Sequence, residues 1–172
     1  MKERFNKFSI PIPDYKLAND FKDIHSFICN SDRIIIKPTD SSGSRGVKLI
    51  EPKKMTDEEL FEVFEDTKSF DSNGKVLIEE FIEGPQLSTE SIIKDNKVHT
   101  FGFADRNYSD TKSLIPNIIE NGGVQPSTFF HPMANEIDNL IKNIALSLGI
   151  KNGVIKGDLV FDPGCGAGKH LF

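Results

Sequence analysis

The chain has 172 residues, of which 37% are hydrophobic and 27% are charged, a balance that fits one or two small globular domains and excludes a disordered chain. Its formal net charge of −5 argues against broad binding to nucleic acid or membrane surfaces, and no apolar stretch approaches the roughly 20 residues of a membrane span. Two cysteines and an N-terminus without the apolar core of a signal peptide predict a cytoplasmic protein, whose oligomeric state the composition leaves open.

Hydrophobic periodicity predicts alternating helices and strands. In chain order, the sequence predicts a helix over 17–28, strands over 34–36 and 47–50, a helix that opens at 56, strands over 76–82, 87–94 and 98–103, a helix over 137–148 and a strand over 153–161. Between 105 and 126 the periodicity is weak, which predicts a long and partly irregular connection.

Boundary signals support three of these elements. Thr56 stands three residues before Glu59, a capping box that predicts the start of a helix. The run Asp71-Ser72-Asn73-Gly74 predicts a turn after that helix, and the residues from 47 to 50 are expected to form a hairpin with the strand at 34–36. The helix over 137–148 is expected to end at Gly149.

The segment from residue 33 to 47 reads RIIIKPTDSSGSRGV, a short buried strand followed by a loop rich in glycine and serine. Lys37 is therefore expected at a strand end, beside a loop in which Gly43 and Gly46 allow backbone conformations that other residues resist. A cation next to free backbone N–H groups is typical of a polyphosphate site. A serine-rich hairpin loop with a partly exposed lysine is the alternative that this segment leaves open.

The segment from residue 76 to 88 reads VLIEEFIEGPQLS, an apolar strand that breaks at Gly84-Pro85. Backbone groups freed at such a break can hydrogen-bond the edge of a flat heterocycle, while Phe81 and Ile82 contact its faces. An ordinary strand with acidic residues on its solvent face is the alternative.

A third segment, GVIKGDLVFD, has Asp158 within an apolar strand and Lys156 two residues earlier. Strand alternation places both on one face, where a carboxylate can bind magnesium that is shared with phosphate oxygens. A Lys–Asp pair on a hydrated sheet face explains the pattern equally well.

The glycine-rich run that ends at Lys169 differs from a P-loop, since the residue at the position of its first glycine is Pro163 and His170 follows the lysine. This run is expected to be a turn, not a nucleotide site.

The order of these segments resembles that of the ATP-grasp superfamily. A strand ending in Lys-Pro is followed by a glycine-serine loop, a helix, a strand ending in Glu-Glu-Phe-Ile-Glu-Gly and a late strand with Gly-Asp. The likeness is to its carboxylate–amine ligases and the ATP-binding region of the carbamoyl-phosphate-synthetase type, and it spans residues 5–163. It implies an α+β fold of two small α+β subdomains with mainly antiparallel sheets that grip ATP between them. By position, residues 1–32 would be a lead-in strand and helix, 33–84 the lid subdomain with the glycine-serine loop, and 85–172 a second subdomain that is incomplete at its C-terminal end.

The resemblance also implies the roles of individual residues. The phosphates of ATP would be bound by Lys37 and by the loop residues Ser41, Ser42, Gly43, Ser44, Arg45 and Gly46. Adenine would be bound by Glu79 or Glu80 and the backbone of Phe81 and Ile82. Gln86 stands where many members have an acidic residue for the ribose, Asp158 would bind Mg²⁺, and Lys156 would face the acyl phosphate. Arg106 could hold a substrate carboxylate, since arginine does so with two parallel hydrogen bonds.

The family mechanism is phosphorylation of a carboxylate by ATP, followed by attack of an amine on the acyl phosphate. The implied partners are ATP, Mg²⁺ and a carboxylate and an amine whose identity the sequence does not give. Family members have further segments before and after this region, so we expect a fragment, truncated at both ends and inactive alone, of an ATP-dependent ligase. A noncatalytic nucleotide-sensing or interaction module with the same fold is the alternative, which Gln86 favours slightly, and a plain α/β domain without a nucleotide is a third.

Overall fold

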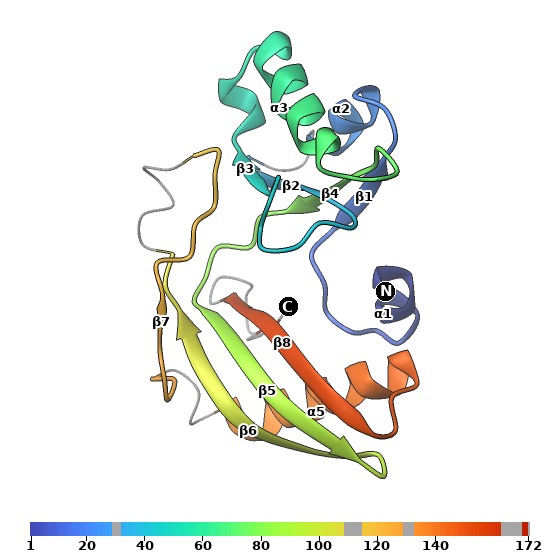
Figure 1. Ribbon diagram of the computed structural model, residues 1–172, viewed down its shortest axis with the longest axis vertical. Coiled ribbons are helices and arrows are strands. Elements are labelled where there is room, and N and C mark those ends of the chain that lie inside the picture. Colours follow the sequence, from blue (N-terminus) through green and yellow to red (C-terminus); the bar gives the residue numbers. More distant parts are fainter. Residues whose placement is uncertain (29–31, 109–114, 129–132, 163–169, 172) are drawn as a thin grey trace. The chain divides into compact units, whose positions relative to one another are not determined.

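The computed structural model describes residues 1–28, 32–108, 115–128, 133–162 and 170–171 (Figure 1). The chain forms two compact units. Unit 1 comprises Met1–Ile12, Ile82–Asn107 and Asn121–Phe172, and unit 2 comprises Pro13–Phe81 and Tyr108–Glu120. The three-part division predicted from the sequence, at 1–32, 33–84 and 85–172, stays a prediction.

Unit 2 is a four-stranded antiparallel sheet with helices on one face (Figure 1). In sheet order, its strands are β1 (Tyr15–Ala18), β4 (Val76–Glu80), β2 (Ile34–Pro38) and β3 (Lys48–Ile50). Its helices are α2 (Lys22–Ile28), the 3-10 helix η1 (Pro52–Lys54) and α3 (Asp57–Ser69).

Alternation along β2 decides which side chains enter the core of unit 2. Ile34 and Ile36 are fully buried and pack with Leu60 and Phe64 of α3. Because successive strand residues point to opposite faces, Lys37 points away from this core. The predicted hairpin is confirmed, since β2 and β3 pair antiparallel.

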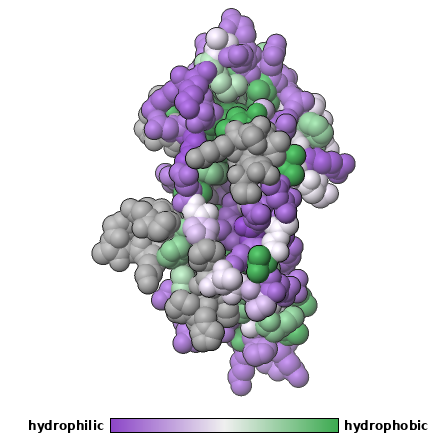
Figure 2. Space-filling view, turned by 90° about the vertical axis from the view of Figure 1, so that its left-hand side faces the viewer, coloured by the Kyte–Doolittle hydropathy of each residue, from purple (hydrophilic) through white to green (hydrophobic). Residues whose placement is uncertain are grey.

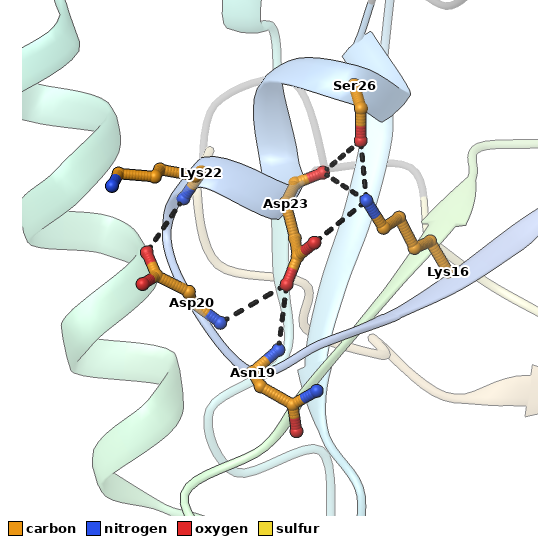
Figure 3. Close-up of polar contacts among 6 residues, drawn as sticks. All are labelled: Lys16, Asn19, Asp20, Lys22, Asp23 and Ser26. Atoms are coloured by element: carbon orange, nitrogen blue, oxygen red, sulfur yellow. Dashed lines mark hydrogen bonds and ion pairs between the residues drawn. The ribbon is translucent and has the colours of Figure 1, made fainter.

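The predicted helix over 17–28 is wrong in its first part. Residues 15–18 are strand β1, and α2 begins only at Lys22. Figure 3 shows the reason: the Asp23 carboxylate accepts hydrogen bonds from the N–H groups of Asn19 and Asp20, which turns the chain into the helix. Lys16 on β1 forms an ion pair with the same carboxylate at 2.9 Å, and these bonds hold the pKa of Asp23 below its usual value. Residues 15–18 pair antiparallel with β4, and this pairing together with the polar contacts at the start of α2 replaces the longer helix that the spacing of apolar residues predicted.

The boundary signals around α3 are confirmed. Thr56 accepts a hydrogen bond from the N–H of Glu59, and the Glu59 carboxylate accepts one from the N–H of Thr56. Residues 71–74 form the predicted turn, where the N–H of Gly74 donates to the carbonyl of Asp71.

Part of the long connection predicted after β6 extends the sheet of unit 2. The N–H of Leu49 donates to the carbonyl of Pro116 at 2.8 Å. Lys48 donates to Asn117 at 2.9 Å and forms an ion pair with Asp66 of α3 at 3.2 Å. The edge strand β3 is therefore covered by a segment that follows β6 in the sequence.

Unit 1 is a five-stranded antiparallel sheet with α5 (Ala134–Leu148) packed on one face (Figure 1). In sheet order, its strands are β7 (Gly123–Val124), β6 (Lys97–Arg106), β5 (Gln86–Lys94), β8 (Gly153–Asp162) and β9 (His170–Leu171). The short helix α1 (Lys2–Lys7) also belongs to this unit. Its core consists of Leu87, Phe103, Ile137, Ile141 and Leu159.

The end of α5 agrees with the prediction. Gly149 follows the helix with φ 74°, the left-handed conformation that glycine adopts most readily. Antiparallel sheets with helices packed on them confirm the predicted α+β class.

Hydrophilic residues cover most of the coloured surface in Figure 2, with small hydrophobic patches among them. Among the described residues, none of the helices has the length and apolar character needed to cross a membrane.

The capping box of α3 allows a simple test of local stability. We expect Thr56→Ala to lower the free energy of unfolding by about 1 kcal/mol, because the N–H of Glu59 loses its acceptor. Urea denaturation would measure the change. Ser69→Ala, near the other end of the same helix, is the control and should change stability by less than about 0.5 kcal/mol; equal effects would contradict the role of the cap.

Candidate functional site

Lys37 lies near the end of β2, on the sheet face opposite α2 and α3. Its ammonium is 2.7 Å from the carboxylate of Glu79 on the neighbouring strand β4. The register pairs Ile35 with Glu79 and Lys37 with Leu77, so the two charged residues are diagonal neighbours on one face. The Glu79 side chain is 8% exposed and that of Lys37 is 33% exposed. The lysine therefore combines a buried acidic partner with a solvent-accessible amine.

The glycine-serine loop after β2 is exposed over most of its length and is built from tight turns. Gly43, Ser44 and Gly46 have φ of 67°, 56° and 74°, the left-handed region that favours glycine. The side chain of Arg45 donates to the carbonyl of Ser42 at 3.1 Å, and the N–H of Val47 donates to the carbonyl of Ser44. Exposed N–H groups in consecutive turns can bind an anion.

Asp71 anchors the start of this loop. Its carboxylate accepts hydrogen bonds from the N–H and hydroxyl of Thr39, at 2.6 and 2.5 Å, and from the N–H groups of Asn73 and Lys75. Burial would raise the pKa of this carboxyl, which is 8% exposed, but the hydrogen bonds from Thr39, Lys75 and Asn73 outweigh it and hold the pKa well below its usual value. The carboxylate is therefore charged and fully engaged at neutral pH.

Two more contacts tie the loop to the turn after α3. Asp40 accepts hydrogen bonds from the N–H and the hydroxyl of Ser72. At the far end of the loop, a Cβ on Gly46 would lie 2.8 Å from the ring of Phe70. Both ends of the loop thus rest on Phe70 and on the turn at residues 71–74 that follows it.

In the segment predicted to bind adenine, two backbone N–H groups already donate hydrogen bonds within unit 2. The N–H of Glu80 donates to the carbonyl of Asp14 at 2.9 Å, and the N–H of Phe81 donates to the carbonyl of Arg33 at 3.3 Å. The Arg33 guanidinium lies 4.7 Å from the centre of the Phe81 ring. The side chain of Glu79 contacts Lys37, so its predicted contact with adenine stays a prediction.

In unit 1, the predicted polar residues share the sheet face opposite α5. The register pairs residues 86 with 106, 88 with 158, and 90 with 156. Arg106 is 3.6 Å from the carboxylate of Asp158 and donates to the hydroxyl of Ser88 at 3.4 Å. Asp158 is 70% exposed, so solvent screens this ion pair. The face therefore brings together Gln86, Arg106, Lys156 and Asp158, as strand alternation requires.

The described residues do not make a complete metal site. No group of three or more histidine, cysteine or acidic side chains gathers in the described part of the chain. Asp158 has the right chemistry for Mg²⁺, but its described partner is the Arg106 guanidinium. One exposed carboxylate facing a cation falls short of the ligand set that magnesium requires.

Sequence reasoning missed the loop anchors Thr39, Asp40 and Asp71, and it also missed Ser88. The run Asp71-Ser72-Asn73-Gly74 gave a turn signal, but nothing in it indicated which distant segment the turn would hold. Ser88 could have been found from its alternation with Gln86 on the same strand. The glycine-rich run at 163–169 lies outside the described residues.

Comparison with known families agrees with this geometry. The profile of the family described as phosphoribosylglycinamide synthetase, ATP-grasp (A) domain, matches residues 1–115 of the 172.

The chain belongs to this ATP-grasp family.

Individual relatives support the assignment. The phosphoribosylamine–glycine ligase of Streptococcus pneumoniae is 27% identical over 159 residues, which cover 90% of this chain and 36% of the ligase. D-alanyl-alanine synthetase A of Vibrio cholerae has a TM-score of 0.75 at 11% identity, over 99% of this chain and 51% of that one. The biotin carboxylase domain of the Hydrogenobacter thermophilus 2-oxoglutarate carboxylase was solved with MgADP, ADP and bicarbonate. It has a TM-score of 0.72 at 18% identity, over 99% of this chain and 37% of that one.

These likenesses confirm two predictions. The chain has the α+β ATP-grasp fold, and it is an ATP-grasp domain of the kind found in ligases. The chain spans about a third of the length of the streptococcal ligase.

The loop geometry of this ATP-grasp domain can be tested with a pair of glycines. We expect Gly43→Ala and Gly46→Ala each to destabilise the fold by about 1 kcal/mol, because both have positive φ. Gly46→Ala should cost about 1–3 kcal/mol more, since only its Cβ meets Phe70, while no atom lies within 4 Å of a Cβ at Gly43. Thermal or urea unfolding measures both, and equal losses would contradict the packing of Gly46 on Phe70.

The hydrogen bonds of Asp71 predict a pH-dependent contribution to stability. We expect Asp71→Asn to lower the free energy of unfolding by about 2 kcal/mol at pH 7, because several donors lose a charged acceptor. The folded-state pKa is depressed, so this contribution is present above the unfolded pKa of about 3.9 and is lost as pH falls toward the folded value.

Urea unfolding of the wild type and of Asp71→Asn at several pH values gives the difference in their free energies of unfolding. It should be constant between about pH 5 and 7 and shrink below about pH 4. A difference that does not change with pH would contradict the role of the charge.

Proposed function

We propose that this chain binds ATP and that unit 2 supplies the phosphate contacts. Lys37 offers a partly exposed ammonium at the end of β2, and the loop from Ser41 to Gly46 follows it directly. The anchoring of this loop on Asp71 and Phe70 is the observation that carries the proposal, because a loop held at both ends keeps its N–H groups in place before a ligand arrives.

We assign adenine to the segment at the end of β4. The N–H of Phe81 already donates to Arg33, so the N–H of Ile82 and the carbonyls of this segment are the groups we propose for the base. Glu80 remains a candidate for the exocyclic amine. Gln86 is proposed for the ribose, since an amide can accept from or donate to a sugar hydroxyl.

The polar face of unit 1 is proposed to serve the reacting groups. Arg106 would hold a carboxylate, and Lys156 would stabilise the charge of the acyl phosphate. We propose Mg²⁺ as the companion of ATP, with Asp158 as one carboxylate ligand, which requires that Asp158 leave Arg106.

For the whole protein we propose an ATP-dependent ligase that activates a carboxylate as an acyl phosphate and joins it to an amine. The name of the streptococcal relative points to phosphoribosylamine and glycine, and we extend to this protein only the classes carboxylate and amine. This chain spans 36% of that relative, so ATP binding is proposed for the chain and catalysis for the whole protein. The noncatalytic module is not favoured, since the relatives named above carry the names of a ligase, a synthetase and a carboxylase.

Calorimetric titration with ATP, with and without Mg²⁺, tests the proposal. We expect measurable binding by the wild-type chain and at least about tenfold weaker binding by Lys37→Met, because a charged contact with the phosphates is lost. Lys53→Met removes a lysine of unit 2 whose described partner is Asp32, and it should bind ATP like wild type. No binding by wild type, or equal binding by Lys37→Met, would sink the phosphate assignment.

A further inference from the structure

We infer that Asn121 is a site of spontaneous deamidation, an inference that does not depend on ATP binding. Three asparagines of the chain precede a glycine, namely Asn73, Asn121 and Asn152. In such a pair the backbone nitrogen of the glycine can attack the side-chain amide of the asparagine, because no side chain on the glycine hinders the approach. The reaction depends on whether the glycine N–H is already hydrogen-bonded, and in this respect the three pairs differ.

The chemistry needs only water. The glycine nitrogen gives up its proton to hydroxide and bonds to Cγ of the asparagine, the bond from Cγ to Nδ2 breaks, and ammonia leaves with a proton taken from water. Water then opens the resulting five-membered imide on one side to give aspartate, or on the other to give isoaspartate, whose main chain runs through the former side chain. A hydrogen-bonded glycine N–H must first break its bond, which slows the first step.

The turn after α3 protects the pair at Asn73. The N–H of Gly74 donates to the carbonyl of Asp71 at 3.2 Å. The N–H of Asn73 donates to the carboxylate of the same Asp71 at 2.9 Å, so both residues are fixed in the turn. Attack by the nitrogen of Gly74 therefore requires that the turn open.

Strand β8 protects the pair at Asn152. Gly153 is the first residue of β8, and the register pairs it with Ile93 of β5. Farther along the same register, the N–H of Phe161 donates to the carbonyl of Pro85 at 2.9 Å. Hydrogen-bonded pairs recur every second residue in an antiparallel ladder, and Gly153 lies an even number of residues from Phe161. The N–H of Gly153 therefore belongs to a hydrogen-bonded pair.

The glycine nitrogen after Asn121 differs from the other two. Asn121 and Gly122 are both exposed and come just before β7. The N–H of Asn121 donates to the carbonyl of Asn107 at 2.8 Å, and the carbonyl of Gly122 accepts from the N–H of Asn107 at 2.9 Å. Within the described part of the chain, however, the N–H of Gly122 donates no hydrogen bond. The attacking nitrogen is therefore available in the folded protein.

Deamidation at Asn121 would alter the strand edge beside Arg106. The register pairs Arg106 with Gly123, and a Cβ at Gly123 would lie 2.4 Å from the carbonyl oxygen of Asp105, so the two segments approach closely. Isoaspartate lengthens the main chain by one carbon atom between the two groups that bond to Asn107. We therefore expect the isoaspartate form to lose at least one of these two hydrogen bonds.

Incubation of the whole chain in mildly alkaline buffer, followed by tryptic digestion and mass spectrometry, tests the inference. Asn73, Asn121 and Asn152 fall in three different tryptic peptides. We expect the peptide with Asn121 to gain the mass of deamidation at least about tenfold faster than the other two, because these react only after local opening. In urea, where the protecting bonds are broken, all three peptides should react at similar rates.

Two variants locate the modification within its peptide. Asn121→Gln keeps the amide but cannot form the five-membered ring, so the mass gain should disappear. Asn117→Gln is the matched control, because Asn117 lies in the same tryptic peptide but precedes an isoleucine, and the mass gain should remain. Reaction at Asn121 no faster than at the other two sites in the folded protein would overturn the inference. So would a mass gain that survives Asn121→Gln, or a preference for Asn121 that persists in urea.

Discussion

The buried carboxylate of Asp71 is the constraint on which the predicted phosphate loop depends. It accepts hydrogen bonds from two segments far apart in the sequence, from Thr39 at the start of the glycine-serine loop and from Asn73 and Lys75 in and after the turn that follows α3. A charged group is stable in such a place only when its acceptor positions are filled, so the same bonds that neutralise the cost of burial also fix the start of the loop. Packing of Phe70 against Gly46 fixes the other end.

An ion pair beside this loop distinguishes the site chemically. The pair of Lys37 and Glu79 lies on the sheet face opposite α2 and α3, beside the loop that Asp71 holds. In unit 1, by contrast, Arg106 and Asp158 form an ion pair in which Asp158 is largely exposed, and solvent screening makes it weak. The cationic group of unit 2 is therefore held by a buried partner, while the acidic group of unit 1 can exchange partners more easily.

Several elements of this ATP-grasp domain could be predicted because their signals are local. The capping box at Thr56, the turn at residues 71–74 and the glycine after α5 each depend on residues within one or two turns of chain. The start of α2 could not be predicted in this way. Lys16 lies on strand β1 and forms an ion pair with Asp23, and the helix begins only at Lys22. Periodicity alone did not show that contact.

Between residues 34 and 161, apart from η1 and β7, the sequence by itself determined the order of the strands and helices. It also determined the position of Lys37 beside a glycine-serine loop and the common face of Lys156 and Asp158, since alternation and turn chemistry are properties of neighbouring residues. Only the tertiary structure decided the partners of the charged groups. Glu79 is 42 residues from Lys37, and Thr39 is 32 residues from Asp71. Such pairs form because strand register and helix packing bring them together, and that register is set by the whole sheet and not by either segment.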